Sequence, residues 1–131
     1  MKIIILEGWN GRGKTTTLQM VFATLLTNNW TVNNFALIPS PRKIKDFEAI
    51  LSIDSKTVAI FSEGDNQGHC KAAIVNYANC DVLILAHTSR LNALQIPSQH
   101  TSLVIQKTVA NATNSEVQAN AQDCQNIVNN I

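Results

Sequence analysis

The sequence has little charge, and this excludes several classes of partner. Charged residues make up only 15% of the 131 residues, and the formal net charge is +1. No basic field points to nucleic acid, and no charge run points to an anionic membrane surface. Hydrophobic residues make up 45% of the chain, which argues against disorder and favours one globular domain over residues 1–131.

Long apolar runs and clustered cysteines are also missing. The first apolar run, Ile3–Leu6, is broken by Glu7, far short of a secretory signal or of the roughly 20 apolar residues of a membrane span. The cysteines form no CxxC pair, which argues against a disulfide framework or a zinc site. We therefore expect a cytoplasmic protein with three reduced thiols, at Cys70, Cys80 and Cys124.

What is present is an alternation of apolar runs with longer mixed segments, which predicts βαβ units and a mainly parallel sheet. The expected fold class is α/β, a three-layer α/β/α sandwich around a mostly parallel five-stranded sheet. Helices are predicted from the spacing of their apolar residues at 14–27, 43–53, 69–79 and 115–131. The last of these is predicted to bury one side, formed by Val117, Ala121, Cys124 and Ile127 or Val128. Strands are predicted at 2–6, 31–38, 57–61, 82–86 and 101–106.

One motif carries chemistry, a match to G-x-x-x-x-G-K-[ST] between the first predicted strand and the first predicted helix. Its glycines let the backbone turn and approach a phosphate, and its amides with the helix N-terminus form a nest for anionic oxygens. The lysine reaches the β- and γ-phosphates, and the hydroxyl that follows it ligates Mg²⁺. The predicted nucleotide-binding residues are Gly8, Trp9, Asn10, Gly11, Arg12, Gly13, Lys14, Thr15 and Thr16.

The stretch Leu6-Glu7-Gly8 followed by Gly11-Arg12-Gly13-Lys14-Thr15-Thr16 resembles the phosphate-binding loop of P-loop nucleoside and nucleotide kinases, the thymidylate kinase type above all. The resemblance covers about fifteen residues. It implies a P-loop NTPase fold with the loop-bearing strand at the centre of the sheet. It also implies that the amide and hydroxyl of Thr16 lie near the α-phosphate.

A second carboxylate is needed to hold Mg²⁺, normally at the end of a neighbouring apolar strand. Glu63 and Asp65 follow the predicted strand 57–61 and are the candidates, with Thr15 as the third metal-binding residue. Asp65 is also predicted to orient the nucleophile. Arg90, after the strand 82–86, is a candidate for neutralising charge on the transferred phosphoryl group, or else a solvated loop residue. Arg42 and Lys43 could meet an acceptor phosphate or lie on the surface.

The expected function is therefore phosphoryl transfer from ATP with Mg²⁺, with Lys14, Asp65 and Arg90 as the catalytic residues. No Asn-Lys-x-Asp segment for reading guanine is present, which favours ATP. The partner would be a nucleoside triphosphate, together with a small-molecule or nucleotide phosphate acceptor. A small nucleoside- or nucleotide-kinase-like enzyme leads. An ATPase and a non-catalytic nucleotide-binding module for regulation or assembly remain open, as does the oligomeric state.

Overall fold

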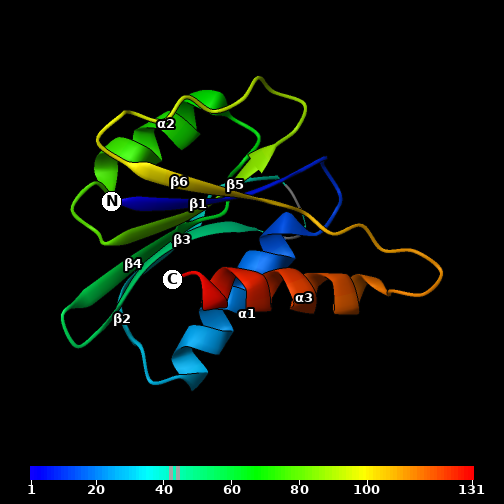
Figure 1. Cartoon of the computed structure of the whole chain (residues 1–131), viewed down its shortest axis with the longest axis horizontal. Coiled ribbons are helices and arrows are strands. Elements are labelled where there is room, and N and C mark those ends of the chain that lie inside the picture. The colour runs from blue at the N-terminus through cyan, green and yellow to red at the C-terminus, as the bar shows by residue number, and fades with distance from the viewer. Residues whose placement is uncertain (42, 44) are drawn as a thin grey trace.

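The computed structural model describes residues 1–41, 43 and 45–131. Helices and strands alternate along most of the chain (Figure 1). The strands are β1 (Lys2–Gly8), β2 (Thr31–Ile38), β3 (Asp46–Ile53), β4 (Lys56–Phe61), β5 (Val82–Thr88) and β6 (Thr101–Gln106). The helices are α1 (Lys14–Thr27), α2 (Gln67–Asn76) and α3 (Glu116–Asn129).

Within the described residues the strands form one six-stranded sheet in the order β2-β3-β4-β5-β1-β6. Strands β4, β5, β1 and β6 are parallel, whereas β3 pairs antiparallel with both β2 and β4. The predicted α/β class is confirmed. The prediction of a five-stranded, mostly parallel sheet is wrong, because the sheet is mixed and has a sixth strand. Strand β1 lies next to the edge strand β6 rather than at the centre of the sheet.

The extra strand is the segment predicted as a helix over 43–53. Residues Ile44, Phe47, Ile50 and Leu51 have helical spacing, but the burial follows a period of two, with Phe47, Ala49 and Leu51 buried on one face. Pairing on both sides, with β2 and β4, satisfies the backbone of β3 and overrides the helical pattern. Ile44 lies outside the described residues.

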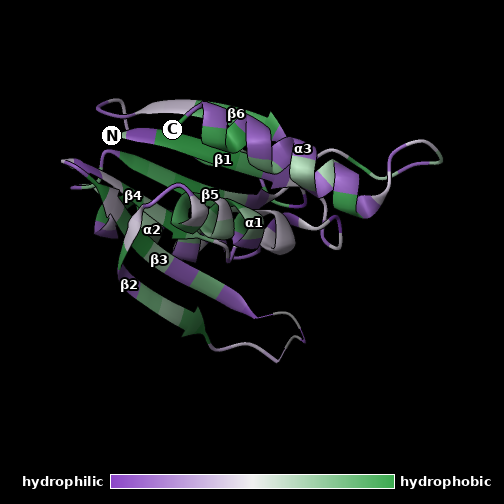
Figure 2. Cartoon of the chain, turned by 90° about the horizontal axis from the view of Figure 1, so that it is seen from below, coloured by the Kyte–Doolittle hydropathy of each residue, from purple (hydrophilic) through white to green (hydrophobic). Residues whose placement is uncertain are grey.

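The sheet is covered on both faces. Helices α1 and α3 pack on one face, around Leu6, Leu18 and Ile127, and α2 packs on the other, around Leu85 and Ile74 (Figure 1). Strand β5 is buried along its whole length, as expected for a parallel strand with helices on both sides. Seen from the α1 and α3 side, the strands β1 and β5 are predominantly hydrophobic (Figure 2).

The buried face of α3 differs from the one predicted, which included Val117 and Ala121. Both residues are exposed, whereas Ala119, Cys124 and Ile127 are buried. The helix begins after Ser115 with a reciprocal capping box to Gln118. Among the described residues, no helix is both long and apolar enough to cross a membrane.

Candidate functional site

The motif residues form a loop between the buried strand β1 and helix α1. Gly11 and Gly13 have φ angles of 76° and 88°, in the left-handed region that residues with a Cβ rarely adopt. The left-handed turn at Gly13 leads directly into the first residue of α1, Lys14. The two glycines therefore make possible the tight turn that places the loop over the helix N-terminus.

The N-terminus of α1 lacks the usual means of satisfying its first N–H groups. Its N-cap residue is Gly13, which has no side chain to accept a hydrogen bond from these groups, and its first turn carries no acidic residue. The positive end of the helix dipole therefore remains without a carboxylate of its own. A cavity of about 330 Å³ lies at this end, lined by Asn10, Gly11, Gly13, Lys14, Thr15, Thr16, Lys43, Ser62, Gly64 and Asp65.

Lys14 reaches back over the loop. Its Nζ donates hydrogen bonds to the carbonyl oxygens of Gly8, at 2.7 Å, and Trp9, at 3.0 Å. These contacts hold the ammonium group beside the cavity that Lys14 itself lines. A cation at this position, together with the helix N-terminus, suits an anionic ligand such as a polyphosphate.

Thr15 is hydrogen-bonded to a buried carboxylate. Its Oγ1 donates to Oδ1 of Asp46 at 2.9 Å, and the Oγ of Ser62 donates to the same oxygen at 2.9 Å. Asp46 is only 4% exposed. Since the Thr15 hydroxyl has given its one hydrogen to Asp46, its oxygen lone pairs are left for a cation. A hydroxyl and a carboxylate are also the oxygen ligands that Mg²⁺ prefers.

Asp46 was missed from the sequence for a topological reason. The second carboxylate was predicted at the end of a strand, because parallel strands all end at the edge where the loop lies. Strand β3 runs the opposite way, so its first residue, Asp46, lies at that edge. The alternation of Phe47, Ala49 and Leu51 in the sequence is compatible with a strand, but it does not specify the direction of that strand, so it does not by itself place Asp46 at this edge.

The two predicted carboxylates diverge after β4. Asp65 lines the cavity at Thr15, and its main-chain oxygen lies 3.3 Å from a guanidinium nitrogen of Arg90. The carboxylate of Glu63 lies 2.8 Å from Nδ1 of His69, on α2. Glu63 lines a different cavity, on the α2 face. Arg90 therefore lies beside Asp65, which lines the cavity at Thr15, whereas Glu63 lies at the cavity on the α2 face.

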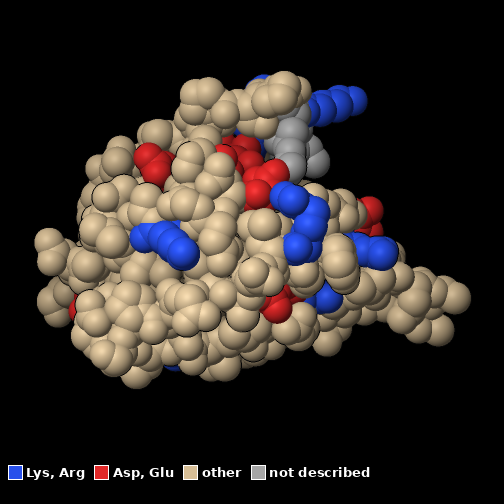
Figure 3. All heavy atoms as spheres, turned by 90° about the horizontal axis from the view of Figure 1, so that it is seen from above, with Lys and Arg blue, Asp and Glu red and all other residues tan. Residues whose placement is uncertain are grey.

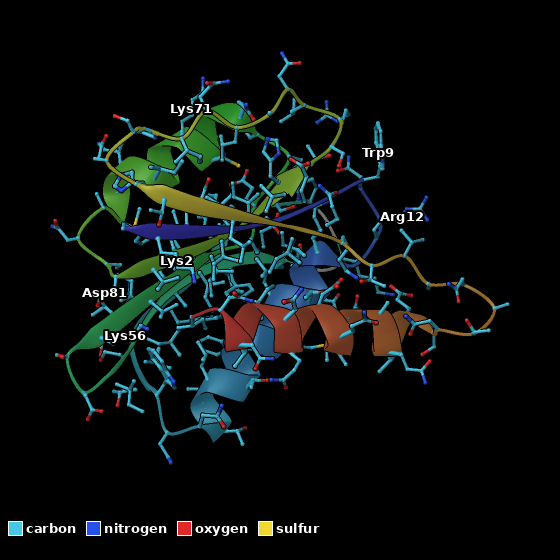
Figure 4. All side chains as sticks on the ribbon, in the orientation of Figure 1. Lys2, Trp9, Arg12, Lys56, Lys71 and Asp81 are labelled. Atoms are coloured by element: carbon cyan, nitrogen blue, oxygen red, sulfur yellow. The ribbon has the colours of Figure 1, made fainter. Side chains whose placement is uncertain are left out.

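Two motif residues extend outward from the loop. Trp9 is 59% exposed, and both Trp9 and Arg12 point away from the sheet (Figure 4). Lys43 lines the cavity, whereas Arg42 lies outside the described residues. Neither Trp9 nor Arg12 belongs to the lining of the cavity at Thr15, so their predicted contact with a nucleotide stays a prediction.

Beneath the loop, a buried histidine connects two strands to α2. Nδ1 of His87 lies 3.0 Å from a carboxylate oxygen of Glu7, and Nε2 lies 2.7 Å from Oε1 of Gln67. Cys70 is buried nearby, and burial, followed by the charges of Glu63 and Asp65, raises the pKa of its thiol to about 12. A thiol that keeps its proton is a poor nucleophile, so Cys70 is a packing residue.

Helix α3 supports the loop from the other side. The side chain of Asn120 lies against Gly13, where an added Cβ would come 2.7 Å from Asn120 Oδ1, and this oxygen is 3.2 Å from Thr17 Oγ1. Three residues further along, Asp123 forms a buried ion pair with Lys107 at 2.9 Å. Gly13 is therefore held between α1 and a helix from the far end of the chain.

In comparisons with known proteins, no family model, no curated protein and no solved structure matches the chain. Across residues 1–41, 43 and 45–131, no group of three or more His, Cys, Asp or Glu side chains could hold a metal ion. The loop instead suits an anion. The hydroxyl of Thr15 and the buried carboxylate of Asp46 are oxygen ligands of the kind that a cation accompanying the anion would need.

Proposed function

We propose that the chain is a P-loop nucleotide-binding protein that binds ATP with Mg²⁺ at the loop Gly8–Thr15 and transfers its terminal phosphoryl group. The observation that carries the proposal is that Thr15, which lines the same cavity as Lys14, is hydrogen-bonded to the buried carboxylate of Asp46. The hydroxyl of Thr15 and the ammonium group of Lys14 then serve one cavity at a helix N-terminus that has a glycine as its N-cap, and the carboxylate of Asp46 lies behind the hydroxyl. This combination matches what a metal-bound polyphosphate requires.

Each residue has a role in this proposal. The loop amides and Lys14 hold the phosphate oxygens, and Thr15 with Asp46 holds Mg²⁺, directly or through water. When bound, the metal neutralises charge on the phosphates. Asp65 orients the nucleophile from the same cavity, and Arg90, anchored to the main chain of Asp65, supplies positive charge beside it. Asp46 replaces Glu63 as the second carboxylate.

The acceptor distinguishes the candidate activities. A small nucleoside- or nucleotide-kinase-like phosphotransferase is the leading proposal, and its support is the resemblance of the loop to those kinases. Water as the acceptor would make the protein an ATPase, and binding without turnover would make it a nucleotide-binding module. The position of Lys43 on the cavity lining favours an anionic acceptor, because its ammonium group is a second cation there.

Calorimetry with ATP and Mg²⁺, combined with phosphate-release and acceptor-phosphorylation assays, tests the proposal. We expect binding with ATP and with a non-hydrolysable analogue, and turnover that depends on an acceptor. Lys14→Ala should weaken ATP binding by about tenfold to a hundredfold, since a charge-assisted hydrogen bond contributes about 1.5–3 kcal/mol. Lys71→Ala, on the outer surface of α2 (Figure 4), is the matched control. No affinity for any nucleotide at millimolar concentration would refute the proposal.

A magnesium titration distinguishes which of the three carboxylates, Asp46, Asp65 or Glu63, holds the metal. Asp46→Asn should raise the Mg²⁺ concentration needed for half-maximal ATP binding by about tenfold, because one charged ligand or water-bridging group is lost. Asp65→Asn should have a smaller effect on this titration and a larger one on turnover. Glu63→Gln, which lies on the other cavity, is the control. If the Mg²⁺ titration is unchanged with Asp46→Asn and shifted with Asp65→Asn, then Asp65 and not Asp46 is the carboxylate that holds the metal.

A further inference from the structure

A second cavity lies on the α2 face of the sheet and shares no lining residue with the cavity at Thr15. It has a volume of about 310 Å³ and lies between the end of β2, the end of the β3–β4 pair at Glu48 and Phe61, and α2. The polar part of its lining includes the carboxylates of Glu48 and Glu63, and the apolar part includes Ile38 and Phe61, which both belong to the hydrophobic cluster under α2. A volume near 300 Å³ with an apolar wall and a few converging polar groups is typical of small-molecule sites.

Each carboxylate is held by one neighbour from α2. The hydroxyl of Tyr77 donates to Oε2 of Glu48 at 2.8 Å, and Nδ1 of His69 lies 2.8 Å from Oε1 of Glu63. Burial, and then the hydrogen bond to Glu48, raise the pKa of Tyr77, so its hydroxyl remains a donor. Tyr77 and His69 therefore fix the two carboxylates in position and occupy one oxygen of each.

The other oxygen of each carboxylate has no partner among the described residues, and no described Lys or Arg forms an ion pair with Glu48 or Glu63. Viewed from the α2 side, acidic side chains gather above the middle of this face, and basic side chains lie on both sides of them (Figure 3). The cavity thus presents two acceptor groups of the same charge sign next to an apolar wall.

We propose that this cavity binds a small organic cation, an amine whose ammonium group is received by Glu48 and Glu63 and whose apolar body lies against Ile38 and Phe61. An anionic ligand would meet two carboxylates and is disfavoured. A bare metal ion is also disfavoured, because Glu48, Glu63 and His69 do not form a metal-binding group. The site is separate from the proposed nucleotide site and does not depend on it.

Titration of the ¹⁵N-labelled protein with phenethylamine, followed by NMR, tests the proposal. We expect saturable shifts of backbone amides in β4 and α2, with 2-phenylethanol, the neutral analogue, binding at least tenfold more weakly. Glu48→Gln and Glu63→Gln should each weaken amine binding about tenfold, which corresponds to about 1.4 kcal/mol. Glu116→Gln, an exposed acid in the first turn of α3, should bind the amine as the parent does.

The spectra also show whether each variant is folded, since amide dispersion is retained only in a folded protein. Tyr77→Phe keeps both carboxylates and the packing of the ring but removes the hydroxyl that positions Glu48. It should weaken amine binding by a smaller factor than Glu48→Gln. Equal affinity for amine and alcohol, parent-like amine binding by both Gln variants, or no shifts at about 10 mM amine would overturn the proposal.

Discussion

Asp123→Asn should destabilise the protein strongly, because it leaves the buried Lys107 without its counter-charge. The side chain of Lys107 is 0% exposed and that of Asp123 is 4% exposed, and their charged atoms are 2.9 Å apart. Removing one partner of a buried ion pair costs about 3–5 kcal/mol. We expect the lower end of this range, since Lys107 still donates to the carbonyl oxygen of Thr108 at 2.8 Å.

A loss of about 3 kcal/mol corresponds to a fall in Tm of roughly 10–15 °C for a chain of this length. Urea denaturation followed by circular dichroism measures this loss. The urea concentration at the midpoint should fall, while the dependence of the unfolding free energy on urea concentration stays the same. The double variant Lys107→Met with Asp123→Leu, which removes both charges together, should recover most of the loss. Glu116→Gln, an exposed acid on the same helix, should cost less than about 1 kcal/mol.

An unfolding free energy within about 0.5 kcal/mol of the parent for Asp123→Asn would refute this reasoning. It would mean that water or a neighbouring group takes over the role of the carboxylate. Failure of the double variant to recover would point instead to the hydrogen bonds that Asp123 accepts from Thr108, at 2.7 Å and 2.6 Å.

The other predictions concern single positions. Gly64→Ala should cost more than about 2 kcal/mol in a urea melt, because the new Cβ would lie 2.5 Å from the carbonyl carbon of Ala86. Gly68→Ala, inside α2 with only a side-chain atom at 3.3 Å, should be tolerated and is its control. Ser115→Ala should lose about 1 kcal/mol through the α3 capping box. Cys70, with its pKa raised to about 12 from 9.0, should resist iodoacetamide at pH 8 until the protein unfolds. The thiol ionises at a lower pH in the unfolded chain than in the folded protein, so the stability that the buried thiol contributes is complete below pH 9. This contribution should be lost as the pH rises from about 9 to 12. Urea melts of the parent and of Cys70→Ala across this pH range measure the loss.

Most elements were predictable from the sequence because their local patterns agree with their final burial. Helix α1 and strands β2 and β6 have the predicted bounds, and the remaining parallel strands differ by one or two residues at an end. The glycine-rich motif was visible because its glycines have a local task, the two left-handed turns at Gly11 and Gly13. Such signals need no knowledge of tertiary contacts.

The antiparallel strand β3 and the carboxylate at its start were not predictable in the same way. Apolar residues Phe47, Ile50 and Leu51 fit a helix as well as a strand, and only pairing with β2 and β4 decides between them. The position of Asp46 beside Thr15 then depends on the direction of β3, which no local pattern specifies. Only part of the candidate site was therefore predictable. The loop proposed to bind an anion is given by a local motif, whereas the carboxylate proposed to hold a cation, Asp46, depends on the topology of the sheet.

The contact between Asn120 and Gly13 links the order of synthesis to the completion of the loop. The motif is made early, but the groups that pack behind Gly13 and Thr17 belong to α3, more than a hundred residues later. During translation the loop therefore remains without this support until α3 has left the ribosome. A nascent or shortened chain that lacks α3 would carry the full motif and still lack the packing that holds Gly13 in its left-handed turn.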